Sequence, residues 1–517
     1  MLSRNKFLNI VFTIEVVLFG LIIIVVLPRV VALYLAVGLV AYVLFASLED
    51  ITILFIRSIP LFLALPLTAN FDNFNTWRIL SAIIFLKWIW PRLTFNLSIR
   101  QFVKKFKNHS ILLIVILLLA ILSIIPALDK IATIKRIVYF VNLSMIGFVI
   151  YDFAKNKEFT KRLIVNISIP IIVVTIVGFI QLTSTYLMDI YQFMHLWGEK
   201  IQCNQFGNQW CNIAVWKGNT WLAYYGPQLS LRVFSLFPDS HSFPVFLLLG
   251  LPAVFAMSSY KVIEKNSLKE MIHTRAKMFV LWIPIIFLAA ILSGTRGIWA
   301  ASVGVLLLAI IILFYMKKHH LGVQLLSVFK YISCYLAVFF LLFAIAYPIF
   351  ISPQFLVGKM DLGILGNRIR SIIDFGETSN SLRLEIWKKS LVSIRHHPLL
   401  GVGIGNFPVV LSQDIKLAKA GSSAHNLYLH VAAEMGIVAA IAMLWFFWEV
   451  FKTTYQKFVS SEDSFMAIFY GSCLLFFPWV LAYLLTDAAL FDERAFLLFV
   501  TVVSIILATK NPAKARS

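Results

Sequence analysis

The sequence predicts an all-α polytopic membrane protein with about 14 (12–14) transmembrane helices and a large helical extracytoplasmic loop. Sixty per cent of its 517 residues are apolar and 13% are charged, whereas soluble domains average about 45–50% and about 25%. The apolar residues form long runs, and the charge-free run 111–128 is long enough to cross a bilayer. The basic residues, which give a net charge of +21, lie between these runs. This distribution does not form the basic face of a nucleic-acid-binding protein.

Taken in order, the apolar runs predict fourteen membrane spans. The first run follows Arg4 and Lys6, and no small-residue cleavage site comes after it. We therefore interpret it as a retained anchor rather than a signal peptide. The predicted spans cover residues 8–28, 30–47, 51–68, 76–90, 111–128, 137–153, 163–184, 243–260, 278–293, 298–316, 331–350, 425–449, 465–486 and 494–509.

The distribution of Lys and Arg predicts the orientation of these spans. Cytoplasmic loops of bacterial membrane proteins carry an excess of basic residues. If the N-terminus is cytoplasmic, the inner segments hold 24 of the 45 basic residues, and nine of the others lie in the single long segment 351–424. This alternation predicts that both termini are cytoplasmic. It places the two long loops, 185–242 and 351–424, outside.

Two cysteines are close together in the first long outer loop. Cys203 and Cys211 are eight positions apart, in a compartment that is oxidising in most bacteria. We expect them to form a disulfide. A metal site is the weaker alternative because no other Cys or Asp ligand lies beside them.

The second long outer loop contains a helical pattern. Its apolar residues recur at spacings of three and four, and His397-Pro398 should end the helix. Basic residues are interspersed, and one of them, Arg395, is a candidate substrate-binding residue. Such a basic amphipathic helix can lie at the level of the lipid headgroups or pack as part of a small lid. The apolar positions are Leu384, Trp387, Leu391 and Ile394.

Three short polar segments lie beside predicted spans at the outer membrane edge. An Arg at a span end is usually a lipid-headgroup anchor, but Arg296 sits in a turn so tight that its guanidinium must lie at the mouth of the bundle. His425 on its own would be read as an ordinary interfacial histidine. The segments are Leu231–Ser240, Ser293–Gly297, and His397–Phe407 followed by Ala424–Leu429 and Glu434–Gly436.

Together and in this order, the segments resemble those of the superfamily of O-antigen ligases and O-antigen polymerases, which are glycosyltransferases of the bacterial envelope. The resemblance covers mainly residues 230–450. It departs from the family at Pro238-Asp239-Ser240-His241, where Pro-Asn is frequent. We accordingly divide the chain into N-terminal spans (1–230), a ligase-like core (231–450), and C-terminal spans with a cytoplasmic tail (451–517).

The resemblance implies a reaction at the outer face of the bacterial inner membrane. A glycan would pass from an undecaprenyl pyrophosphate carrier to a hydroxyl of a glycan or lipid acceptor, without cofactor or metal. Arg forks suit phosphate oxygens, so Arg232 and Arg296 are the candidate ligands of the pyrophosphate. His425 is the candidate general base, with Asn426 and Tyr428 supporting it and binding substrate.

Other functions remain open at this point. A repeat polymerase and a protein O-oligosaccharyltransferase of the same fold would use the same residues. A transporter of lipid-linked glycans would place its polar groups near the bilayer midplane. The candidate residues here cluster at the outer edge, which favours a transferase.

Overall fold

The computed structural model describes residues 6–68, 74–93, 108–208, 210–211, 220–225, 228–259, 276–320, 322–357, 378–413 and 422–508. Most of these residues are helical, which confirms the predicted all-α class. The strands form two short antiparallel hairpins: β1 (Ala64–Leu65) with β2 (Phe74–Asn75), and β3 (Leu222–Tyr225) with β4 (Gln228–Leu231).

The N-terminal part contains long helices followed by short ones. The long helices are α1 (Lys6–Ile23), α2 (Val31–Phe45), α3 (Leu48–Ser58), α4 (Thr76–Leu93), α6 (Asn108–Leu122), α7 (Lys130–Phe153) and α8 (Lys157–Ser184). The short helices are α9 (Ile190–Phe193), the π-helical segment η2 (Met194–Gln202) and α10 (Cys203–Phe206).

The C-terminal part is also helical, and its short helices again lie between longer ones. The helices are α12 (Ser242–Ser259), α14 (Ala276–Leu292), α15 (Arg296–Lys318), α16 (Val323–Leu341), α17 (Phe343–Phe350), α19 (Thr378–His396), α20 (Phe407–Val410), α21 (Leu427–Met435), α22 (Ile437–Val459), α23 (Ser464–Tyr483) and α24 (Glu493–Ala508). Short 3-10 turns lie at Ile59–Leu61 (η1), Gln354–Leu356 (η4) and Ala489–Phe491 (η5).

Within the described residues, seven helical stretches are long and apolar enough to cross a membrane, and four shorter helices are also apolar. The chain is therefore a multi-pass membrane protein, although the count of fourteen spans is not confirmed. Several predicted spans differ from the structure, among them the following two. The run 51–68 stops being α-helical at Ser58, just before Pro60, which lacks the N–H that a helix interior needs. The run 425–449 is broken at Gly436 into α21 and α22.

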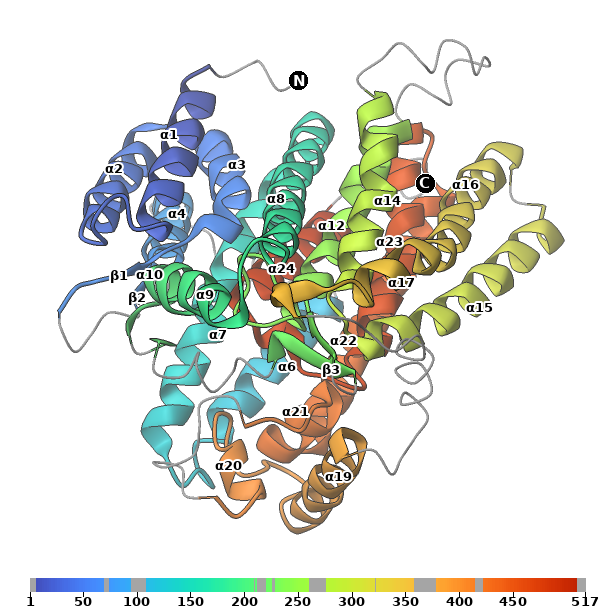
Figure 1. Cartoon of the computed structure of the whole chain (residues 1–517). Coiled ribbons are helices and arrows are strands. Elements are labelled where there is room, and N and C mark those ends of the chain that lie inside the picture. The colour runs from blue at the N-terminus through green and yellow to red at the C-terminus, as the bar shows by residue number, and fades with distance from the viewer. Residues whose placement is uncertain are drawn as a thin grey trace.

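The core of the bundle is formed by α12, α23 and α24, which lie at its centre in Figure 1, with α1 to α4 on one side and α15 and α16 on the other. The side chain of Trp479 on α23 is fully buried, and its Nε1 donates to the carbonyl of Ile298 at 2.9 Å. In contrast, Tyr34 of α2 is 72% exposed. Large exposed apolar residues on a peripheral helix suit contact with lipid tails. α19, α20 and α21 gather at one end of the bundle.

The first long loop packs back onto that bundle. The Sγ atoms of Cys203 and Cys211 are bonded, and their Cα atoms are 4.9 Å apart. The side chain of Gln202 donates to the carbonyl of Phe237 at 2.9 Å, and Trp197 Nε1 donates to Ser184 Oγ at 2.9 Å. The loop is thereby tied both to α8 and to the turn that precedes α12.

Candidate active site

The turn between β4 and α12 carries the first polar segment. Gln181 of α8 accepts hydrogen bonds at its Oε1 from the backbone N–H groups of Phe234 and Ser235, both at 3.0 Å. Asp239 accepts at Oδ1 from the N–H groups of His241 and Ser242, at 3.0 and 2.8 Å. These contacts fix the backbone on both sides of the turn, so the positions of Arg232 and His241 are determined.

The turn before α15 contacts Arg232 and is followed directly by Arg296. Arg232 is 9% exposed, and its Nε donates to the carbonyl of Ser293 at 3.3 Å, while its terminal nitrogen lies 3.4 Å from Thr295 Oγ1. Gly294 has a positive φ of 63°, and a Cβ there would lie 3.0 Å from Arg232 Cγ. Glycine is favoured here because the backbone is left-handed. Arg296, the first residue of α15, is half-buried beside this contact.

The same turn also accommodates the end of α23. A Cβ on Gly297 would overlap Thr486 Oγ1 and would lie 2.8 Å from the ring of Tyr483. Because Gly297 has no side chain, the end of α23 can approach the start of α15. This approach places Tyr483 and Asp487 at the two-arginine turn, a juxtaposition that no sequence motif indicated.

His425 reaches the same place from the second long loop. The N–H of Leu427 donates to the carbonyl of Leu484 at 2.9 Å, which docks the start of α21 on the end of α23. His425 Nδ1 then lies 3.7 Å from Asp487 Oδ2. Nδ1 is buried, yet 41% of the His425 side chain is exposed, so the accessible part of the ring faces away from Asp487. The positive φ of His425, 46°, is uncommon outside glycine and is frequent at functional sites.

Asn426 and Tyr428 hold the backbone of this segment. The side chain of Asn426 accepts from the N–H groups of Tyr428 and Leu429 at 3.0 Å each, and so caps α21. The Tyr428 hydroxyl donates to the carbonyl of Leu481 at 2.8 Å. These bonds position His425 through the main chain rather than by contact with its ring.

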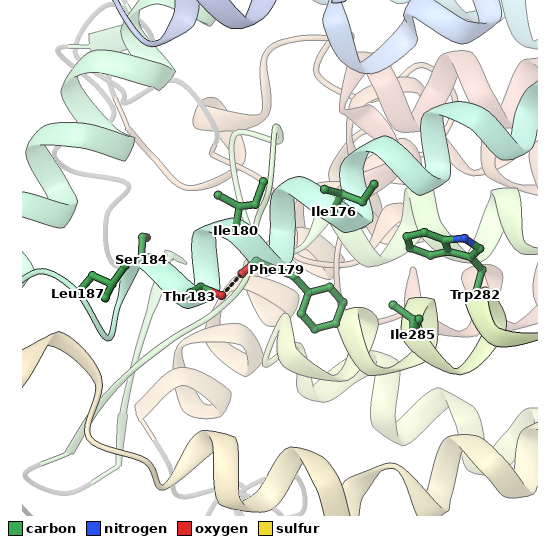
Figure 2. Close-up of a pocket in the computed structure, with 8 residues that line it drawn as sticks. All are labelled: Ile176, Phe179, Ile180, Thr183, Ser184, Leu187, Trp282 and Ile285. Carbon is green, nitrogen blue, oxygen red and sulfur yellow. Dashed lines mark hydrogen bonds between the residues drawn. The ribbon is translucent and has the colours of Figure 1, made fainter. Parts of the chain in front are cut away.

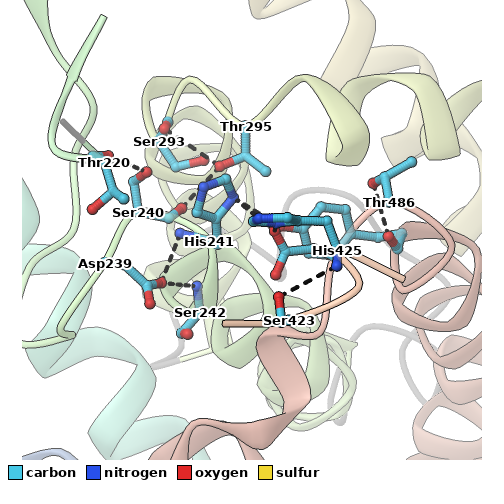
Figure 3. A network of polar contacts seen from close by, with 12 residues as sticks. Thr220, Asp239, Ser240, His241, Ser242, Ser293, Thr295, Ser423, His425 and Thr486 are labelled. Carbon is cyan, nitrogen blue, oxygen red and sulfur yellow. Dashed lines mark hydrogen bonds and ion pairs between the residues drawn. The ribbon is translucent and has the colours of Figure 1, made fainter. Parts of the chain in front are cut away.

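His241 is the second histidine of the site. Its Nδ1 lies 3.1 Å from the Tyr483 hydroxyl and 3.4 Å from Asp487 Oδ2. Figure 3 shows the rings of His241 and His425 close together, within a network that includes Ser293 and Thr295. The carboxylate of Asp487 is therefore shared by two imidazoles.

The charges at this carboxylate are set by burial and by its neighbours. Burial lowers the pKa of His241 to about 4, an effect that Asp487 partly opposes and Arg232 and Arg383 reinforce. His241 is thus neutral at pH 7. Burial raises the pKa of Asp487, but the adjacent imidazoles of His241 and His425 and the charge of Arg383 outweigh it, so the pKa is well below its usual range. Asp487 stays ionised at neutral pH.

Sequence reasoning missed four residues of the site: His241, Arg383, Tyr483 and Asp487. Arg383 is half-buried on α19, and its charge acts on both His241 and Asp487. The predicted binding residue Arg395 is exposed in the last turn of the same helix. Twelve residues separate the two arginines, which corresponds to about 18 Å along a helix. The structure therefore does not bring Arg395 to the cluster around Asp487.

His430 and Glu434 form a buried side-chain pair on α21, the helix that follows His425. His430 Nε2 lies 3.3 Å from Glu434 Oε2, and its Nδ1 accepts from the N–H of Ala424 at 3.3 Å. Glu434 also accepts from the N–H of Phe407 at 3.0 Å. Both side chains are buried. His430 thus holds the residue before His425, in agreement with the structural role that its spacing from Glu434 indicates.

The glycine-rich part of the second loop is interlocked with the break between α21 and α22. The N–H groups of Val402 and Gly403 donate to the carbonyls of Ala433 and Glu434, at 3.0 and 2.9 Å, and the N–H of Ile437 donates to the carbonyl of Pro398 at 2.8 Å. Gly436 has φ 89° and ψ 166°, a region that is essentially restricted to glycine. This interlock supports the loop that carries His425.

We expect Gly436→Ala to destabilise the fold. A Cβ would overlap the carbonyl of Leu399, and the backbone conformation alone costs about 1–3 kcal/mol in a non-glycine residue. The variant should show a lower midpoint of thermal unfolding in detergent and lower abundance in the membrane. Gly304→Ala on exposed α15 surface, where a Cβ meets no atom within 4 Å, is the matched control and should be as stable as the wild type. Equal stability of both variants would contradict the interlock.

An apolar groove lies along α8, the helix that also holds the turn between β4 and α12. It has a volume of about 440 Å³, and Figure 2 shows side chains of α8 and α14 lining it. On another face of α8, Gly178 packs against Val233, the residue after Arg232. A Cβ added at Gly178 would lie 3.0 Å from Val233 Cγ1. The groove is thus separated from the arginine turn by a single helix. Its lining residues are Ile176, Phe179, Ile180, Thr183, Ser184, Leu187, Trp282 and Ile285.

The described residues contain no group of three or more His, Cys, Asp or Glu side chains that could hold a metal ion.

Comparison with known families identifies one segment of the chain. Residues 279–444 match the family model described as O-antigen ligase. The match contains Arg296 and His425, whereas Arg232, His241 and Asp487 lie outside it. No curated protein matches the chain. Residues 279–444 are therefore similar to the O-antigen ligase family, and this match supports the resemblance that the sequence motifs indicated.

Proposed function

We propose that the protein is an O-antigen-ligase-type transferase that moves a glycan from an isoprenoid pyrophosphate carrier to an acceptor hydroxyl, at the outer face of the cytoplasmic membrane. The observation that carries this proposal is the convergence of Arg232, Arg296 and His425 at one end of a membrane bundle. The two arginines suit an anionic leaving group, and the imidazole of His425 beside the carboxylate of Asp487 suits a hydroxyl nucleophile. Both chain termini are then cytoplasmic, as the basic residues predict.

The proposed reaction is a single displacement that inverts the anomeric carbon and requires no metal. The acceptor oxygen forms a bond to that carbon while the bond to the carrier pyrophosphate breaks. His425 takes the acceptor proton, and the imidazolium that forms is stabilised by Asp487 at 3.7 Å. Arg232 and Arg296 stabilise the negative charge that develops on the departing pyrophosphate. The N-terminus of α15 adds its partial positive charge at the same place.

The apolar groove between α8 and α14 supports a lipid-linked donor. Ile180 and Leu187 in its lining are 57% and 75% exposed, as expected for a surface that meets hydrocarbon. An isoprenoid chain lying in this groove would run beside the helix that holds the arginine turn.

The glycan left on the carrier in a deletion strain tests the proposal. If the protein is a ligase, long polymer will accumulate on the isoprenoid carrier, because attachment to the acceptor is lost. Single repeats on the carrier would instead show a polymerase of the same fold. If the deletion strain instead accumulates carrier-linked glycan on the inner face of the membrane and loses it from the outer face, the transferase proposal is wrong and a transporter is indicated. Complementation with the wild-type gene is the control.

A further inference from the structure

Two imidazoles contact one carboxylate in this site, and the proposed reaction uses only one of them. The carboxylate of Asp487 lies 3.7 Å from His425 Nδ1 and 3.4 Å from His241 Nδ1. The side chain of His425 is 41% exposed, but that of His241 is only 19% exposed. His425 is thus open to a substrate, and His241 lies behind the carboxylate.

The surroundings of His241 are rigid and polar. Its Nδ1 lies 3.1 Å from the hydroxyl of the buried residue Tyr483, and its backbone is held by Asp239. The charged groups that face it are Asp487 after α23, Asp239 and Arg232 in its own turn, and Arg383 on α19. Since the imidazole is neutral at pH 7, it contributes an N–H donor rather than a charge.

We propose that His241 is a positioning residue for the transfer reaction, which fixes the carboxylate of Asp487 opposite His425 with the help of Tyr483. The inference rests on the proposed function, in which His425 takes the acceptor proton. A donor at His241 stabilises the ionised carboxylate and limits its two oxygens to one orientation.

Removal of His241 should move the acid limb of the pH–rate profile in a definite direction. Without this donor, the negative charge of Asp487 acts more fully on His425 and favours its imidazolium form. A base must be neutral to take a proton, so the acid limb of the pH–rate profile moves to higher pH. Loss of one hydrogen bond to a charged group also lowers kcat, by roughly 10–100-fold.

The test compares three variants of the purified full-length protein. His241→Phe keeps a ring but has no hydrogen-bond donor. We expect this variant to show the lower kcat and an acid limb of the pH–rate profile at higher pH. His241→Asn places an amide N–H near the position of Nδ1 and should restore most of both values. His195→Phe is the matched control, because His195 also faces a carboxylate, that of Glu199 at 2.7 Å, but is 59% exposed. Wild-type kcat and pH profile in His241→Phe would overturn the inference.

A second readout needs no glycan transfer. The ring resonances of His425, identified by their loss in His425→Ala, are titrated by NMR in detergent micelles without donor. In His241→Phe their midpoint should move to higher pH, and in Asp487→Asn it should move to lower pH. If the wild type transfers no glycan, the proposed function fails while this titration still decides whether His241 controls His425. A midpoint that is unchanged in His241→Phe contradicts the inference.

Discussion

Replacement of His425 by alanine is expected to lower kcat for transfer from a lipid-linked donor by about 10²–10⁴-fold, the usual contribution of a general base. The donor Kd should change little, because the cations that face the pyrophosphate are retained. Asp487→Asn should lower kcat as well, since the imidazolium loses its counter-charge. Transfer and donor binding are measured in parallel on the purified protein.

Two other histidines show whether the effect is specific. His396 is exposed at the end of α19, so His396→Ala should transfer glycan at the wild-type rate. His430→Ala should mainly reduce stability, because His430 is buried between Ala424 and Glu434. The base has been misassigned if His425→Ala turns over within a fewfold of the wild type while a stably folded His430→Ala is inactive.

The fold was predictable from the sequence where local composition decides it. The apolar runs that became α1, α8, α15 and α23 have few charges and no break in their hydropathy, so each has one favourable conformation in lipid. The break at Gly436 was not predictable. A glycine within an apolar run is compatible with a continuous helix, and the positive φ follows from the approach of Leu399, a contact that depends on the tertiary fold.

The site was partly predictable for a similar reason. Arg296 and His425 lie in short segments whose residue types indicate phosphate binding and proton transfer. These two residues could therefore be selected from the sequence alone. Asp487 lies 62 positions after His425, and it reaches the site only because Gly297 lets the end of α23 approach α15. An isolated acid at the end of a predicted span was the only sequence signal for it. Arg383 and Arg395 lie on the same helix, and residue type alone could not tell which of them faces the cluster.

Arg296→Lys is expected to lower kcat/KM for the lipid-linked donor by roughly 10–100-fold, although the charge is kept. A guanidinium can present two N–H donors in a plane to two phosphate oxygens, and an ammonium acts as a compact point charge. Loss of one charge-assisted hydrogen bond costs about 1.5–3 kcal/mol, which corresponds to that range. Unlike His425→Ala, this variant should weaken donor binding as well as turnover.

The decisive comparison is with an arginine at the other end of the bundle. Arg92 at the end of α4 forms an ion pair with Asp152 and is 39% exposed, so Arg92→Lys should leave kcat/KM unchanged. Arg232→Lys should lose activity as Arg296→Lys does, because the Arg232 guanidinium contacts the turn of Ser293 and Thr295 that directly precedes Arg296. If Arg296→Lys matches the wild type in both transfer and donor Kd, its side chain is a membrane anchor. The leaving pyrophosphate would then have to be stabilised by Arg232 and the N-terminus of α15 alone.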